Sequence, residues 1–166
     1  KISDESQLGF GKHFTDRMLV VEWKPEKGWH NGRIEPYAPF SLDPSCMVLH
    51  YSQEIFEGLK AYKWADGRVA LFRPEMNARR FNQSADRICM PELPEEIFLK
   101  GIEQLVSLEK DWVPSAPGTS LYIRPAMIAV EAGLGVKPSS HYYFFVILSP
   151  VGAYYSGGFK PTGIMV

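Results

Sequence analysis

The segment LKAYKWADGRVALFRP, residues 59–74, carries the clearest structural signal in this sequence. Apolar residues alternate on both sides of Asp66-Gly67, a residue pair that closes tight turns between antiparallel strands. Pro74 follows at a position that the first turn of a helix tolerates. The segment therefore predicts a β-hairpin that leads directly into a helix.

Two consecutive helices are predicted downstream of the hairpin. EMNARRFNQSADRI, residues 75–88, has Met76, Arg80, Phe81 and Ala85 at helical spacing. After Pro94, EEIFLKGIEQLVSLEKDW begins with two glutamates and has a lysine near its end, the charge order that a helix dipole favours. Its apolar stripe comprises Ile97, Ile102, Leu105, Val106 and Leu108. PSAPG, residues 114–118, is expected to end this second helix.

Strands are predicted on both sides of the helices. FTDRMLVVEW (14–23) is apolar and rich in β-branched residues, and GWHNG (28–32) has the composition of a turn. SCMVLHY (45–51) is expected to be extended. Two further strand candidates are TSLYIRPAMIAVE (119–131) and HYYFFVILSPV (141–151). Together these elements predict an α+β domain, a mainly antiparallel sheet with two consecutive helices packed on it.

Composition narrows the classes of function. The chain has 166 residues, 45% hydrophobic and 22% charged, which suits one soluble domain. Its net charge of −1 offers no basic field for nucleic acid or an anionic membrane, and YYFFVIL (142–148) is too short to cross a bilayer. Cys46 and Cys89 lie far apart, and no signal-peptide pattern opens the chain. A cytoplasmic protein without a disulfide framework or zinc site is expected.

Common catalytic signatures are absent from the sequence. There is no G-x-G-x-x-G after a predicted strand, no G-x-x-x-x-G-K-[ST] loop and no H-E-x-x-H. The four histidines, at positions 13, 30, 50 and 141, show no metal-binding spacing, so no metal site is expected. Arginines and tyrosines remain as the candidate binding groups.

Two arginines lie where they could bind anions. Arg80 is on the first predicted helix, and an arginine can bind phosphate through two parallel hydrogen bonds. From spacing alone, a surface ion pair with a glutamate is the commoner explanation. In the LYIRP strand, alternation sends Tyr122 and Arg124 to one face and Leu121 and Ile123 to the other. A phenol beside a guanidinium makes a carboxylate clamp, although a salt bridge at a sheet edge fits equally well.

Several segments together resemble a known family. FTDRMLVVEW, LHYSQEIFEGLKAY, LFRPEMNARRFNQSA, DWVPSAPGTSLYIRP, LGVKP and VILSPVGAYYSGG are similar, in order and spacing, to the branched-chain aminotransferases, pyridoxal-phosphate enzymes of fold type IV. The resemblance runs from about Gly9 to Gly158 and is to the N-terminal small domain of that family. It implies an aminotransferase small domain at residues 1–156 and, at 157–166, an interdomain linker leading to a large domain not present in this chain.

The resemblance implies a reaction and an assembly. The reaction is reversible transamination between leucine, isoleucine or valine and 2-oxoglutarate, as used in branched-chain amino acid biosynthesis, with pyridoxal 5'-phosphate as cofactor. The family's lysine that forms the Schiff base with the cofactor belongs to the large domain, so no catalytic residue is expected in this chain, which alone should be inactive. A cytoplasmic homodimer is also implied.

Nine binding residues follow from the resemblance. Arg80 matches the family's cofactor-phosphate arginine, and Tyr122 and Arg124 match the YIRP element that flanks the substrate carboxylate. Residues around the substrate are Phe14, Phe56, Tyr122 and Tyr154, and those that reach the neighbouring subunit's site are Tyr51, Leu134 and Val136. A pocket of aromatic and aliphatic groups suits branched apolar side chains, because it leaves a polar side chain unpaired.

Other functions share part of this pattern. D-amino-acid aminotransferases and aminodeoxychorismate lyases have a similar architecture, although YIRP together with LSPVGAYY favours the branched-chain group. A non-catalytic small-molecule binding module is an alternative of a different class. The length of the intact protein distinguishes such a module from one domain of an enzyme.

Overall fold

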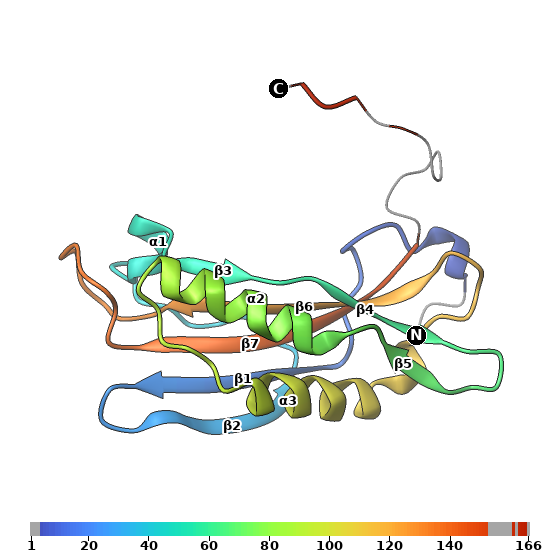
Figure 1. Ribbon diagram of the computed structural model, residues 1–166, viewed down its shortest axis with the longest axis horizontal. Coiled ribbons are helices and arrows are strands. Elements are labelled where there is room, and N and C mark those ends of the chain that lie inside the picture. The colour runs from blue at the N-terminus through green and yellow to red at the C-terminus, as the bar shows by residue number, and fades with distance from the viewer. Residues whose placement is uncertain (1–3, 153–160, 162, 166) are drawn as a thin grey trace.

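An antiparallel sheet with two helices on one of its faces forms the architecture of the chain (Figure 1). The computed structural model describes residues 4–152, 161 and 163–165. The strands are β1 (Arg17–Lys24), β2 (Gly28–Pro36), β3 (Glu54–Phe56), β4 (Leu59–Lys63), β5 (Val69–Leu71), β6 (Ser120–Ala129) and β7 (Tyr142–Val151). The helices are α1 (Met47–Tyr51), α2 (Pro74–Arg87) and α3 (Glu95–Leu108), with short 3-10 helices at Glu5–Gln7 and Lys110–Trp112.

The strand order is β2-β1-β7-β6-β4-β5, with β3 also paired to β6, and every pairing is antiparallel. This arrangement confirms the predicted α+β class. No helix in the described ranges is long and apolar enough to cross a membrane.

The predicted hairpin is confirmed. Strands β4 and β5 pair through Tyr62 and Ala70, and the Trp64 N–H donates to the Arg68 carbonyl oxygen at 2.8 Å across the turn. Gly67 has φ +85°, a conformation that glycine adopts without a side-chain clash. Helix α2 begins at Pro74, so the hairpin leads directly into the helix.

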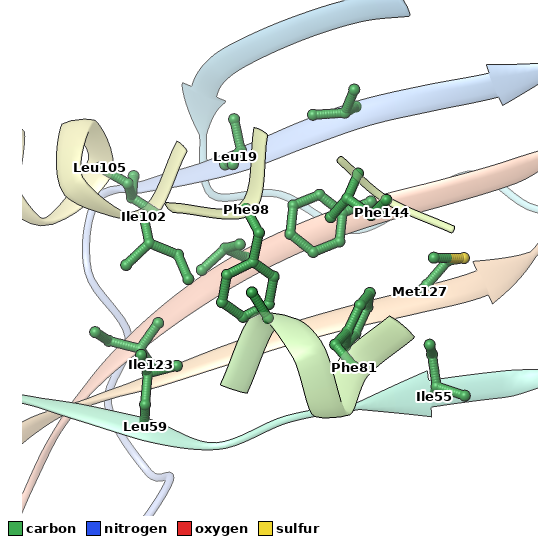
Figure 2. Close-up of a cluster of buried hydrophobic side chains, with 14 of the residues drawn as sticks. Leu19, Ile55, Leu59, Phe81, Phe98, Ile102, Leu105, Ile123, Met127 and Phe144 are labelled. Carbon is green, nitrogen blue, oxygen red and sulfur yellow. The ribbon is translucent and has the colours of Figure 1, made fainter. Parts of the chain in front are cut away.

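The hydrophobic core lies between the sheet and helices α2 and α3. Phe81 of α2, Phe98 of α3 and Phe144 of β7 are buried with ring centroids 5.6–6.0 Å apart (Figure 2). Burying one such side chain contributes about 1.5–3 kcal/mol to stability. The predicted stripe of the second helix was wrong at Leu108, which is 57% exposed, whereas Phe98 points inward.

The predicted turn at GWHNG is wrong, because these residues belong to β2. The chain instead reverses between β1 and β2, at residues 24–27, where the Lys27 N–H donates to the Lys24 carbonyl oxygen at 3.1 Å. The Asn-Gly pair instead forms a β-bulge. The pairing register shifts between Val20 and Glu22, and Asn31 has φ +52°.

The predicted extended segment at SCMVLHY is also wrong, because it forms the short helix α1. Its first turn is anchored by tertiary contacts. Met47 is buried and its N–H donates to the Glu131 carbonyl oxygen at 3.0 Å, while the Cys46 thiol donates to the Ala129 carbonyl oxygen at 3.2 Å. These distant partners override the local preference of Val48 and its neighbours for extended backbone.

Candidate functional site

Three consecutive residues, Phe56-Glu57-Gly58, connect β3 to β4 and lie at the centre of the candidate site; we call them the β3–β4 junction. Both strands pair with β6, through Phe56 opposite Ala126 and Leu59 opposite Ile123. The Glu57 N–H donates to the Pro125 carbonyl oxygen at 2.9 Å. The backbone of the junction is therefore held against β6, and each of its three residues faces a different side chain of the site.

Phe56 packs against Arg124. The guanidinium carbon of Arg124 lies 4.4 Å from the centroid of the Phe56 ring and 5.4 Å from that of Tyr122. Its Nη2 donates to the Tyr122 hydroxyl at 3.0 Å. Such stacking of a cation on aromatic faces is attractive and orients the guanidinium. Phe56 itself is 61% exposed, so an apolar surface adjoins a fixed cation.

The predicted alternation in β6 is confirmed. Leu121 and Ile123 are fully buried in the core, whereas Tyr122 and Arg124 lie on the opposite face of the sheet. The Nε of Arg124 is buried and has no hydrogen-bond partner among the residues that the structure describes. A guanidinium with an unsatisfied donor is suited to donate hydrogen bonds to a carboxylate ligand.

Gly58 makes room for the Tyr122 hydroxyl. A Cβ added at Gly58 would lie 2.3 Å from that oxygen, closer than any van der Waals contact allows. On its other side Tyr122 meets Phe10, edge to face with centroids 5.0 Å apart. Sequence reasoning missed Phe10, because it lies in an irregular segment where no periodicity indicates a direction.

Glu57 binds Arg80 of helix α2. The carboxylate accepts hydrogen bonds from Arg80 Nε at 2.5 Å and from Nη2 at 2.7 Å. It also accepts from Asn77 Nδ2 at 2.9 Å and from the Gly58 N–H at 3.2 Å. Burial raises the pKa of the Glu57 carboxyl, but the hydrogen bonds from Arg80, Asn77 and Gly58 outweigh it and hold the pKa below its ordinary value.

Within the described part of the chain, Arg80 donates hydrogen bonds only to Glu57, so it has donors left for an anion. The Glu57 side chain is 7% exposed, whereas that of Arg80 is 60% exposed. The two hydrogen bonds to Glu57 use two of the five N–H groups of the guanidinium. The glutamate pair expected from spacing alone therefore exists, and the exposed edge of the same guanidinium remains suited to a phosphate group.

A second group of predicted residues meets at the end of the sheet where β6 leads into β7 (Figure 1). The Tyr51 hydroxyl donates to the Leu134 carbonyl oxygen, and the Gly133 N–H donates to the Ser45 carbonyl oxygen at 3.0 Å. Leu134 is 63% and Val136 86% exposed. The structure thus brings Tyr51 into contact with the Leu134 backbone beyond the end of β6, and Val136 follows two residues later in the chain.

One predicted residue that the structure describes, Phe14, joins neither group. The Phe14 ring stacks on Tyr37 with centroids 5.1 Å apart and an interplanar angle of 7°. Tyr154 lies outside the described residues, as does most of the predicted linker at 157–166.

A groove of about 520 Å³ lies elsewhere, between α3 and strands β1 and β2. Leu19, Trp29, Ile34, Ile97 and Lys100 contribute to its lining, and none of the predicted site residues does. Its surface is largely apolar. The candidate site therefore rests on the side chains around the β3–β4 junction and not on this groove.

Comparisons with known proteins give consistent relatives, although no family model matches the chain. It is 57% identical over 164 residues to branched-chain-amino-acid transaminase 1 of Bacillus subtilis, covering 98% of this chain and 46% of that protein. Identity to the probable branched-chain-amino-acid aminotransferase of Streptomyces coelicolor is also 57%, over 159 residues, 95% of this chain and 44% of that protein. The chain spans less than half the length of these curated relatives.

A solved structure is similar in fold. The T.th. branched-chain amino acid aminotransferase, complexed with N-(5'-phosphopyridoxyl)-L-glutamate, aligns with a TM-score of 0.60 and 27% identity. The alignment covers 81% of this chain and 41% of that one.

Proposed function

Because the chain is homologous, over nearly its whole length, to part of the branched-chain-amino-acid aminotransferases, we propose that its protein transfers amino groups between branched-chain L-amino acids and 2-oxoglutarate. The observation that carries this proposal is the 57% identity over 98% of the chain. The side chains around the β3–β4 junction support it, since they combine two arginines, Arg80 and Arg124, with an exposed aromatic surface.

Pyridoxal 5'-phosphate is the proposed cofactor. The solved T.th. relative is complexed with a phosphopyridoxyl derivative of glutamate. In this chain, the exposed edge of Arg80 would hold the phosphate through charge-assisted hydrogen bonds. When bound, the cofactor supplies the electron sink for amino transfer, and the protein supplies binding and orientation.

Tyr122, Arg124 and Phe56 are proposed to bind the substrate. The two substrates share one site, yet 2-oxoglutarate carries a second carboxylate where leucine carries an isobutyl group. Arg124 offers hydrogen-bond donors to the carboxylate, and the Phe56 ring beneath it offers apolar contact to the branched side chain. Because Arg124 is held by stacking, it does not require a carboxylate partner when leucine is bound.

The remaining parts of the machinery are proposed to lie outside this chain. Residues 1–156 would form the small domain and 157–166 a linker, consistent with relatives more than twice as long. The lysine that moves the proton would belong to the following domain. The group around Tyr51, with its exposed Leu134 and Val136 side chains, would complete the site of a second subunit in a homodimer, because burying these side chains is favourable.

Activity of the full-length protein tests the proposal. The protein with pyridoxal 5'-phosphate should convert leucine, isoleucine and valine in the presence of 2-oxoglutarate, and a protein ending at residue 166 should not. Turnover of D-alanine without turnover of branched-chain substrates would instead indicate a D-amino-acid aminotransferase. Pyruvate release from aminodeoxychorismate without such turnover would indicate an aminodeoxychorismate lyase. Ligand binding without any turnover by the full-length protein would indicate a binding module.

A further inference from the structure

We propose that Glu57 is a positioning residue, whose buried carboxylate holds the Arg80 guanidinium so that its exposed edge receives the cofactor phosphate. This inference rests on the proposed role of Arg80 as the phosphate ligand. It assigns to Glu57 a function distinct from direct ligand binding, because the carboxylate contacts Arg80 and not the anion.

The first observation is the geometry of the pair. Two hydrogen bonds, at 2.5 and 2.7 Å, join Nε and Nη2 of Arg80 to the two oxygens of Glu57. Two parallel bonds between planar groups define both the direction and the rotation of the guanidinium. The remaining N–H groups of Arg80 therefore point along a fixed edge, away from the carboxylate.

The second observation is that Glu57 is itself immobilised. Its side chain is 7% exposed, and its oxygens accept additional hydrogen bonds from Asn77 and from the Gly58 N–H. Its own N–H is bonded to β6 through the Pro125 carbonyl oxygen at 2.9 Å. Asn77 lies three residues before Arg80 on α2, so the same helix face supplies both partners of the carboxylate.

The third observation is the exposure of Arg80. A side chain that is 60% exposed on a helix samples several rotamers unless a partner restrains it. A ligand that bound such a mobile arginine would lose affinity, because ordering the side chain costs conformational entropy. Glu57 removes that cost before the phosphate arrives.

The charge of Glu57 acts in the opposite direction, since a carboxylate repels a phosphate. In the structure this charge is compensated by Arg80 and by two further hydrogen-bond donors. If repulsion dominated, neutralising Glu57 would strengthen phosphate binding. If Glu57 positions Arg80, neutralising Glu57 should instead weaken phosphate binding. The direction of the change in affinity therefore distinguishes repulsion from positioning.

Cofactor titration of the full-length apo-protein tests the inference. Dissociation constants are measured spectroscopically for pyridoxal 5'-phosphate and for pyridoxal, which lacks the phosphate. Glu57→Gln should raise the constant for pyridoxal 5'-phosphate about tenfold, the lower end expected for loss of a hydrogen bond to a charged group, and leave that for pyridoxal unchanged. Glu54→Gln, at an exposed position on β3, is the matched control and should change neither.

A double variant shows whether Glu57 acts through Arg80. Arg80→Ala should itself lower the preference for pyridoxal 5'-phosphate over pyridoxal, and adding Glu57→Gln should lower it no further. If Arg80→Ala leaves the preference unchanged, the proposed role of Arg80 fails. If Arg80→Ala lowers it but Glu57→Gln leaves or raises it, the phosphate assignment stands and the positioning role is overturned.

Asn77→Ala provides a second variant in case Glu57→Gln folds poorly. It removes one hydrogen bond to Glu57 and retains both charges of the ion pair. A smaller loss of the same preference is expected. An unchanged preference in Asn77→Ala, with affinity for pyridoxal retained, would also overturn the inference.

Discussion

Substituting Gly58 by alanine should displace Tyr122 and weaken substrate binding. The added Cβ would lie 2.3 Å from the Tyr122 hydroxyl oxygen and 3.0 Å from Cζ. An ordinary contact is about 3.5 Å, so the phenol must move by roughly 1 Å. The phenol has little freedom to do so, because Phe10 packs on its ring and Arg124 donates to its oxygen at 3.0 Å.

The size of the effect follows from these contacts. Overpacking of this kind typically costs about 1–3 kcal/mol of stability, and a hydrogen bond from a charged group contributes about 1.5–3 kcal/mol. We therefore expect the free energy of unfolding to fall by about 2 kcal/mol. We also expect KM for 2-oxoglutarate to rise about tenfold and KM for leucine to change less, because moving Tyr122 disturbs the hydrogen bond that orients Arg124, the proposed partner of the second carboxylate.

Urea denaturation and steady-state kinetics of the full-length protein measure the two effects. Gly32→Ala is the matched control, because a Cβ there meets Val21 only at ordinary distances of 3.7 and 3.9 Å. In a Tyr122→Phe background, Gly58→Ala should cost less, since the nearest clashing atom is gone. Unchanged stability and unchanged KM in Gly58→Ala would refute the argument that this glycine sets the position of Tyr122.

Three further predictions concern specificity, assembly and pH. Arg124→Met should impair the half-reaction with 2-oxoglutarate more than that with leucine, by about 2 kcal/mol or thirtyfold in kcat/KM. Phe56→Ala should impair the half-reaction with leucine more. Single-turnover kinetics measure both half-reactions, and equal losses on the two substrates would contradict these assignments. Val136→Asp should shift the full-length protein from dimer to monomer in analytical ultracentrifugation. An unchanged dimer would show that Val136 does not lie in the dimer interface. Because the folded pKa of Glu57 is lowered from its ordinary 4.5, its contribution to stability is present above that pH and is lost as pH falls through the folded pKa. Glu57→Gln should therefore flatten the acid side of the pH–stability curve, and an identical curve would show that the carboxylate gains nothing from its donors.

Secondary-structure elements that depend on residues close together in the sequence could be predicted. The hairpin depends on Asp66-Gly67 and its flanking alternation, and helices α2 and α3 on apolar spacing and end signals. The direction of Tyr122 and Arg124 follows from the two-residue period of a strand with one buried face. In each case the residues that determine the conformation are neighbours in the sequence.

Elements that depend on distant partners were mispredicted or missed. The Asn-Gly pair in GWHNG is typical of a turn, but pairing of β2 with β1 converts it into a bulge. Helix α1 forms from an extended-looking segment because its first residues bond to Ala129 and Glu131. Strand β3 is only three residues long and exists through its pairing with β6.

The same division applies to the candidate site. The resemblance of short motifs predicts Arg80, Tyr122 and Arg124 as binding residues, and their placement on a helix and on one face of a strand follows from local spacing. The arrangement around them required the folded chain: Glu57 reaches Arg80 and Asn77 only because α2 packs beside β3, and Phe56 lies under Arg124 only because β3 pairs with β6. Neither contact has a periodic signal, since the direction of a side chain at a break between strands is set by the partners that fill the space around it.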